Sequence, residues 1–201
     1  MSVNLTKGEK FDLKKSTGGS FKKLIVGLGW DVNKKAQNRG FLARFFGKNE
    51  HFDCDVSAIL CVDGKIRSNS DVVYFGNLKH PSEAVEHLGD NLTGFGEGDD
   101  EQIMIMLDKL PSKYDKIVFV VNIYNCESRK QHFGMIENAF IRVVEADTSE
   151  EICRYNLSDN YSGKTSLIAG EVYKSNGSWK FNAIGQGTED KSLNDLENRY
   201  M

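Results

Sequence analysis

Short apolar segments, several with hydrophobic residues at alternate positions, follow one another along the chain between turn-forming residues. Alternation with a period of two is typical of β-strands, because successive side chains of a strand point to opposite faces. The clearest example is 116–124, in which Ile117, Phe119, Val121 and Ile123 share one face. The same criterion favours a strand over a helix at 102–107, where isoleucine and methionine alternate. Further strands are predicted at 24–28, 56–62, 71–75, 140–144, 152–157, 167–174 and 179–184.

Two dipeptides predict tight turns between strands. Asp63-Gly64 and Asn176-Gly177 are strong hairpin signals, because both residues of such a turn need positive backbone φ angles. The first turn is expected to lead into a short return strand around Ile66.

Helical signals are few. A short helix is predicted at 81–88, because a proline stands in its first turn and Gly89 follows its end. Leu193, Leu196 and Tyr200 have helical spacing, which predicts an amphipathic helix near the C-terminus. Many short strands and the lack of alternating long helices predict an all-β fold, an antiparallel β-sandwich with a few short helices.

Composition narrows the possible classes of protein. A chain of 201 residues is expected to form a single domain, 1–201, and the basic, aromatic segment at about 34–50 is interpreted as an inserted loop. The net charge of −3 argues against a nucleic-acid partner, since such binding depends on neutralising phosphates. We expect no signal peptide and no transmembrane segment. The four scattered cysteines then indicate reduced thiols and a cytoplasmic location.

The segment 89–101 is the most informative part of the chain. It contains five carboxylates and no lysine or arginine, and these charges repel one another unless a cation lies among them. Carboxylate, amide and carbonyl oxygens are the ligands that Ca²⁺ prefers. The candidate ligands in this segment are Asp90, Asn91, Asp99, Asp100 and Glu101.

Three further acids extend this candidate metal site. Asp53 and Asp55 are two residues apart, so on a strand both carboxylates would point to the same face. Asp31 follows a predicted buried strand. Carboxylates gathered at the ends of sandwich strands can form a cup for one or two Ca²⁺ ions. The residues alone leave a solvated acidic loop as the alternative, since acidic glycine-rich loops are common.

Six stretches of this chain are informative when taken together: 26–31, 52–58, 89–102, 116–124, 138–142 and 179–187. In this order they resemble the TerD family of tellurite-resistance and general stress proteins. The resemblance implies a β-sandwich that binds calcium through the acidic loop and the paired aspartates. It also implies a role in tellurite resistance or a broader response to chemical stress. The chain departs from the family pattern at Phe95 and Glu97, where glutamate and aspartate are expected, and in the length of the 34–50 loop.

These observations favour a binding or scaffold module, not an enzyme. Its expected partners are other proteins, such as TerD-like chains or membrane-associated complexes. One alternative is a metal-assisted hydrolase that uses the same acidic cup, although calcium generates nucleophilic water poorly. Another is a calcium-controlled membrane adaptor, which only the basic-aromatic loop at 34–50 supports.

Two cysteine-based sites are weaker alternatives. His51 and Cys54 could form half of a zinc site, but no second Cys/His pair has suitable spacing. Cys126 and His132 could form a thiolate pair, but no third orienting residue is evident and a buried structural cysteine is commoner.

Overall fold

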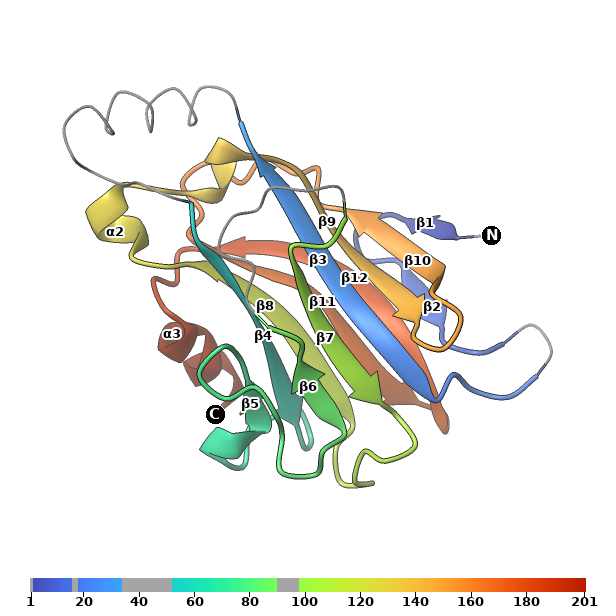
Figure 1. Cartoon of the computed structure of the whole chain (residues 1–201). Coiled ribbons are helices and arrows are strands. Elements are labelled where there is room, and N and C mark those ends of the chain that lie inside the picture. Colours follow the sequence, from blue (N-terminus) through green and yellow to red (C-terminus); the bar gives the residue numbers. More distant parts are fainter. Residues whose placement is uncertain (1, 16–17, 34–51, 90–97) are drawn as a thin grey trace.

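Two six-stranded sheets pack face to face in the computed structural model, which describes residues 2–15, 18–33, 52–89 and 98–201 (Figure 1). The order across sheet 1 is β1 (Val3–Leu5), β10 (Glu150–Asn156), β9 (Ile136–Glu145), β3 (Lys23–Val32), β7 (Glu101–Met106) and β6 (Val85–His87). The order across sheet 2 is β2 (Lys10–Asp12), β12 (Ser178–Thr188), β11 (Ser166–Ser175), β8 (Lys116–Ile123), β4 (Cys54–Cys61) and β5 (Val72–Val73).

Strand pairing within both sheets is antiparallel except where β1 runs parallel to β10. The predicted all-β, sandwich-like architecture is therefore confirmed. The segment interpreted as an inserted loop, 34–50, lies outside the described residues.

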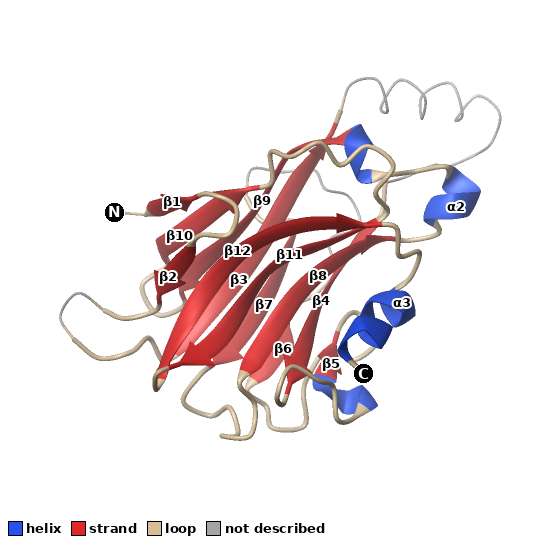
Figure 2. Cartoon of the chain, turned by 180° about the vertical axis from the view of Figure 1, so that it is seen from behind, coloured by secondary structure: helices blue, strands red, loops and turns tan. Residues whose placement is uncertain are grey.

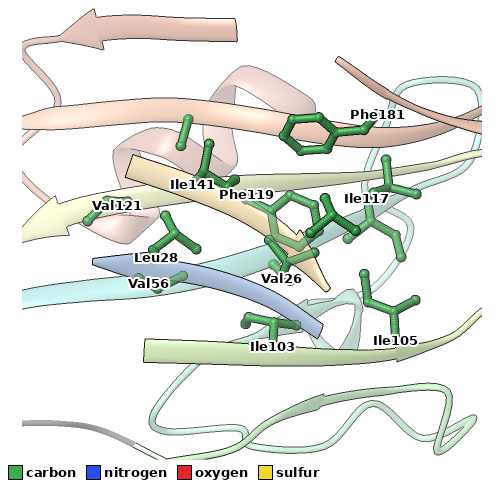
Figure 3. Packing of buried hydrophobic residues seen from close by; sticks show 14 of the residues in the cluster. Val26, Leu28, Val56, Ile103, Ile105, Ile117, Phe119, Val121, Ile141 and Phe181 are labelled. Carbon is green, nitrogen blue, oxygen red and sulfur yellow. The ribbon is translucent and has the colours of Figure 1, made fainter. Parts of the chain in front are cut away.

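The core lies between the sheets and follows the period of two (Figure 3). On β3, Val26 and Leu28 are buried and point toward sheet 2, where Phe119 and Val121 of β8 occupy the facing positions. Each such side chain contributes about 1.5–3 kcal/mol to folding when it is fully buried. The alternation that predicts these strands is thus the same feature that stabilises the sandwich.

Within the described residues the helices are short and lie outside the two sheets. They are α2 (Cys126–Arg129), α3 (Leu193–Glu197) and the 3₁₀ turns η1 (Asn69–Asp71), η2 (Phe133–Met135) and η3 (Asn198–Tyr200). Figure 2 shows α3 beside sheet 2, and its Leu196 packs with Ile59 and Val118 in a smaller cluster on the outer face of that sheet. The predicted C-terminal helix is confirmed. None of the helices in the described part of the chain is long and apolar enough to cross a bilayer.

Two local predictions are wrong. The segment 81–88 is not a helix: a turn with Glu83 at φ 59° leads into β6. Val85 and His87 of β6 point inward, and pairing with β7 satisfies the backbone groups that a helix would have satisfied internally. There is also no return strand at Ile66. The Asp63-Gly64 turn forms, but Ile66 N–H donates to Tyr200 O and β5 pairs with β4 instead.

Candidate cation site at the acidic end of the sandwich

Three strand termini meet at one end of the sandwich, which we call the acidic end. Antiparallel pairing of β3 with β7 places Leu28 opposite Glu101, so the C-terminal part of β3 lies beside the start of β7. The start of β4 joins them, because Glu101 Oε2 accepts a hydrogen bond from Val56 N–H at 2.8 Å. This end contains every predicted ligand that the structure describes: Asp31, Asp53, Asp55, Asp99, Asp100 and Glu101. Asp90 and Asn91 lie outside the described residues.

Glu101 points into the interior. Its side chain is buried, and besides Val56 N–H it contacts His87 Nε2 at 3.2 Å. Gly89 N–H donates to His87 Nδ1, which leaves Nε2 as the ring nitrogen that faces Glu101. The short strand β5 pairs with β4 only at Ala58 and Ile59. Val56 lies outside this pairing, and its N–H donates to the Glu101 carboxylate instead. Glu101 therefore links the two sheets.

Asp99 lies on the outer face of sheet 1, above Gly27. Arg142 donates to its two carboxylate oxygens from Nε at 2.7 Å and from Nη2 at 3.1 Å, and Gln102 Nε2 donates at 2.9 Å. The side chain is 1% exposed. A Cβ atom added at Gly27 would lie 2.1 Å from Asp99 Oδ2, so only glycine leaves room for this carboxylate.

Asp100 is bonded to the C-terminal part of β3, the strand that carries Asp31. Its Oδ2 accepts a hydrogen bond from Trp30 N–H at 2.7 Å. Burial raises the pKa of Asp100, the Trp30 N–H opposes this shift, and the negative charges of Asp31 and Asp99 raise the pKa further. Asp31 is exposed and accepts a hydrogen bond from Asn138 Nδ2 at 2.8 Å. A cation between Asp31 and Asp100 would relieve this repulsion.

Asp53 and Asp55 lie at the start of β4 or directly before it. Asp55 is buried opposite Asn122 of β8, whose Nδ2 lies 3.4 Å from Asp55 Oδ2. The buried Asn122 Oδ1 has no hydrogen-bond partner among the described residues. Asp53 forms an ion pair with Arg129 of α2 at 3.7 Å. A carboxylate and an orphaned amide oxygen side by side form a hard donor set that fits Ca²⁺.

The predicted ligands therefore share one end of the molecule but divide among four surroundings. Glu101 lies between the sheets, Asp99 lies on the outer face of sheet 1, Asp31 and Asp100 lie at the C-terminal part of β3, and Asp55 lies beside Asn122 on sheet 2. Within the described residues, no three Asp, Glu, His or Cys side chains form a group that could hold a metal ion. A complete calcium site would need further oxygens, and the sequence predicts them at positions 90 and 91.

All four cysteines are buried, and burial raises the pKa of each thiol. Burial, followed by the nearby carboxylates, raises the pKa of Cys54 well above its usual value, so this thiol is a poor ligand for zinc. Burial also raises the pKa of Cys126, whose Sγ lies 3.9 Å from Lys191 O. His132 Nδ1 accepts a hydrogen bond from Gly134 N–H and begins the η2 turn.

Sequence reasoning assigned no role to Arg142, His87 or Asn122, although each contacts a predicted ligand. The available signal was Gly27-Leu28-Gly29, because two glycines at alternate positions of a strand leave a bare strip on one face. His87 could not be found, because it lies in the segment predicted as a helix.

The fold and this site define a class: a β-sandwich protein whose acidic side chains gather at one end of the strands. A family model described as "TerD domain" matches residues 1–200, and the chain belongs to the TerD family.

Several curated proteins and solved structures are similar to this chain. It is 52% identical over 202 residues to stress response protein SCP2 of Bacillus subtilis (strain 168), covering 100% of both chains. It is 43% identical over 188 residues to tellurium resistance protein TerD of Serratia marcescens, covering 93% of this chain and 91% of the relative. A crystal structure of a homologue of telluride resistance protein (TerD) from Streptomyces coelicolor A3(2) has a TM-score of 0.63 at 19% identity, covering 87% and 94% of the two chains. That structure supports the fold.

Proposed function

We propose that this protein is a calcium-binding module of a cytoplasmic stress response, acting by binding other proteins and not by catalysis. Relatives named for stress response and tellurium resistance support the assignment to a stress response. The observation that carries the calcium assignment is the meeting of three strand termini, which brings all the described candidate ligands to the acidic end.

The donor chemistry supports calcium over other ions. The donors are carboxylates and the orphaned amide oxygen of Asn122, and Ca²⁺ takes six to eight such oxygens in flexible geometry. Magnesium demands tighter octahedral geometry and sheds its waters reluctantly. Zinc prefers nitrogen and sulfur ligands, and the nearby Cys54 is held as a thiol.

A binding role is consistent with the ion. Calcium is a poor generator of nucleophilic water, so an acidic calcium site is better suited to holding surfaces in place than to hydrolysis. The cysteines, which are all unpaired and buried, are compatible with the reducing conditions of the cytoplasm.

Calcium titration of chelator-stripped protein tests this proposal. Binding to the native state alone stabilises it by about 2.7 kcal/mol at a hundred times Kd. For a chain of this size that corresponds to a rise in Tm of about 5–11 °C. Native mass spectrometry would report whether one or two ions bind. Magnesium at the same concentration should give a smaller shift.

Two aspartate variants make the titration specific. Asp31→Asn removes a carboxylate at the acidic end and should blunt the calcium-dependent rise in Tm. Asp108→Asn removes the same charge from an exposed position beyond β7, at the opposite end of that strand, and should leave the rise unchanged. A Tm that is indifferent to calcium in the stripped wild-type protein would contradict the proposal and favour the solvated acidic loop.

A further inference from the structure

The outer face of sheet 1 carries a strip of bare backbone where β3 has Gly27 and Gly29. Residues 98–100, which directly follow the acidic segment, lie on this strip. Gly98 O would be 2.7 Å from a Cβ atom at Gly29, and Asp99 Oδ2 would be 2.1 Å from one at Gly27. Asp100 N–H donates to Leu28 O at 2.8 Å, so the chain is also bonded to β3 through its backbone.

Arg142 fixes the chain in this position. It is opposite Gly27 on the neighbouring strand β9, and its guanidinium reaches across the missing side chain to hold Asp99 through two hydrogen bonds. Glu151 contacts the same guanidinium at 3.2 Å and keeps it oriented. Two-point guanidinium–carboxylate pairing is among the stronger and more directional contacts that a protein makes.

These contacts indicate a different role for Asp99 from the calcium ligand that its sequence context predicts. The side chain is 1% exposed, and three of its roughly four acceptor positions are taken by donors from Arg142 and Gln102. A carboxylate that ligates Ca²⁺ would have to share those oxygens with a cation beside a fixed positive charge, which is unfavourable.

We infer that Asp99 is an anchor and not a calcium ligand, and that the Asp99–Arg142 pair positions the acidic end for its ion. The inference deepens the proposed function and rests on it for its calcium readout. By holding residues 98–100 on β3, the pair sets the place of Asp100, whose carboxylate bonds to Trp30 N–H and lies near Asp31.

The direction in which Arg142→Gln changes the calcium affinity distinguishes an anchor from a ligand. If Asp99 is an anchor, Arg142→Gln releases residues 98–100 and weakens calcium binding, although it removes a positive charge. If Asp99 is a ligand that Arg142 restrains, the same substitution frees the carboxylate and tightens binding. Asp99→Asn weakens binding in both cases and therefore does not discriminate by itself.

Isothermal titration with calcium should show the affinity falling about tenfold or more in both Asp99→Asn and Arg142→Gln, as for other residues that orient ligands. The double variant should be no weaker than the weaker single variant, because both changes break one contact. Arg67→Gln is the matched control: Arg67 follows β4 at the end of that strand away from Asp55, its guanidinium contacts Val62 O and Asp63, and it should stay within about twofold of wild type.

Hydrogen exchange in chelator tests the anchor without calcium. The amides of Trp30 and Asp100 should exchange faster in Asp99→Asn and Arg142→Gln, but not in Arg67→Gln. Unchanged exchange, or tighter calcium binding by Arg142→Gln, would overturn the inference. If wild-type protein binds no calcium, the proposed function fails while the exchange comparison still decides the anchor. Arg142→Lys keeps the charge without the two-point geometry and serves if Arg142→Gln does not fold.

Discussion

Replacing Tyr114 with phenylalanine removes one hydroxyl from a buried polar cluster. The cluster lies near the C-terminal end of β4, and the acidic end lies at the start of that strand. Tyr114 OH donates to Asp71 Oδ1 at 2.6 Å, and His80 Nε2 lies 3.4 Å from the same oxygen. Arg67 N–H and Ser68 N–H donate to the other oxygen at 3.0 and 2.9 Å. All three side chains of the cluster are buried.

Most of the cost of this substitution comes from the lost bond to Asp71, because His80 Nε2, which also lies 3.2 Å from Tyr114 OH, still has Asp71 Oδ1 as an acceptor. A hydrogen bond to a charged group contributes about 1.5–3 kcal/mol, and the phenyl ring keeps the packing of the tyrosine ring. Three donors remain on Asp71, so it stays ionised and the loss should be about 2 kcal/mol. For a chain of this size the Tm should fall by about 4–8 °C.

The effect should depend on pH in a defined direction. Burial by itself raises the pKa of Asp71, but hydrogen bonds from Tyr114, Arg67, His80 and Ser68 outweigh it and hold the pKa below its ordinary value of 3.8. The folded-state pKa is therefore below the unfolded one. The stabilisation by ionised Asp71 is complete above about pH 4 and is lost as the pH falls through the folded-state pKa. The gap between wild type and Tyr114→Phe should narrow in that range.

Urea unfolding at pH 7 and at pH 3 measures both effects. Tyr74→Phe is the control, because the Tyr74 hydroxyl has no hydrogen-bond partner within the described part of the chain. A free energy of unfolding for Tyr114→Phe within about 0.5 kcal/mol of wild type at pH 7, the range of ordinary surface changes, would refute this account of the cluster.

Two further predictions concern the glycine strip and the thiols. Gly27→Ala should lower the free energy of unfolding by about 1.5–3 kcal/mol in urea titrations with chelator, because the new Cβ displaces Asp99 from Arg142. The opposing gain from a less flexible unfolded chain, about 0.5–1 kcal/mol, is smaller. An unchanged urea midpoint of unfolding would show that the strip tolerates a methyl group. A thiol reagent at pH 8 should label no cysteine of the native protein rapidly, because burial raises the pKa of Cys61 and of Cys153 to about 12 and shifts the other two thiols upward as well; rapid labelling of one thiol before unfolding would disprove this.

Most strands could be predicted because their signal is local. Alternation within 116–124 identifies β8, and no knowledge of its neighbours is needed. The strand β6 could not be predicted in this way, because its inward residues, Val85 and His87, are only two. Proline and glycine bracket them as they bracket a helix, and only the pairing with β7 decides the outcome.

The location of the candidate site could also be predicted, but not the separate roles of its acids. Acids at the ends of neighbouring strands lie close together once the strands pair. Whether an acid binds an ion or a protein group depends on its cross-strand neighbours. Asp99 meets Arg142 only because β9 aligns Arg142 with Gly27, and that register joins residues far apart in the sequence.

The different contacts of these acids have a consequence for the ion-free protein. Glu101 bonds to Val56 N–H and His87, and Asp99 bonds to Arg142, and none of these contacts needs a cation. The protein itself therefore compensates the charges of these two acids. The repulsion that remains is centred on Asp100 and Asp31. If the proposed calcium site is correct, a chelator should lower the Tm without unfolding the sandwich, because the contacts of Glu101 and Asp99 hold the acidic end together without an ion.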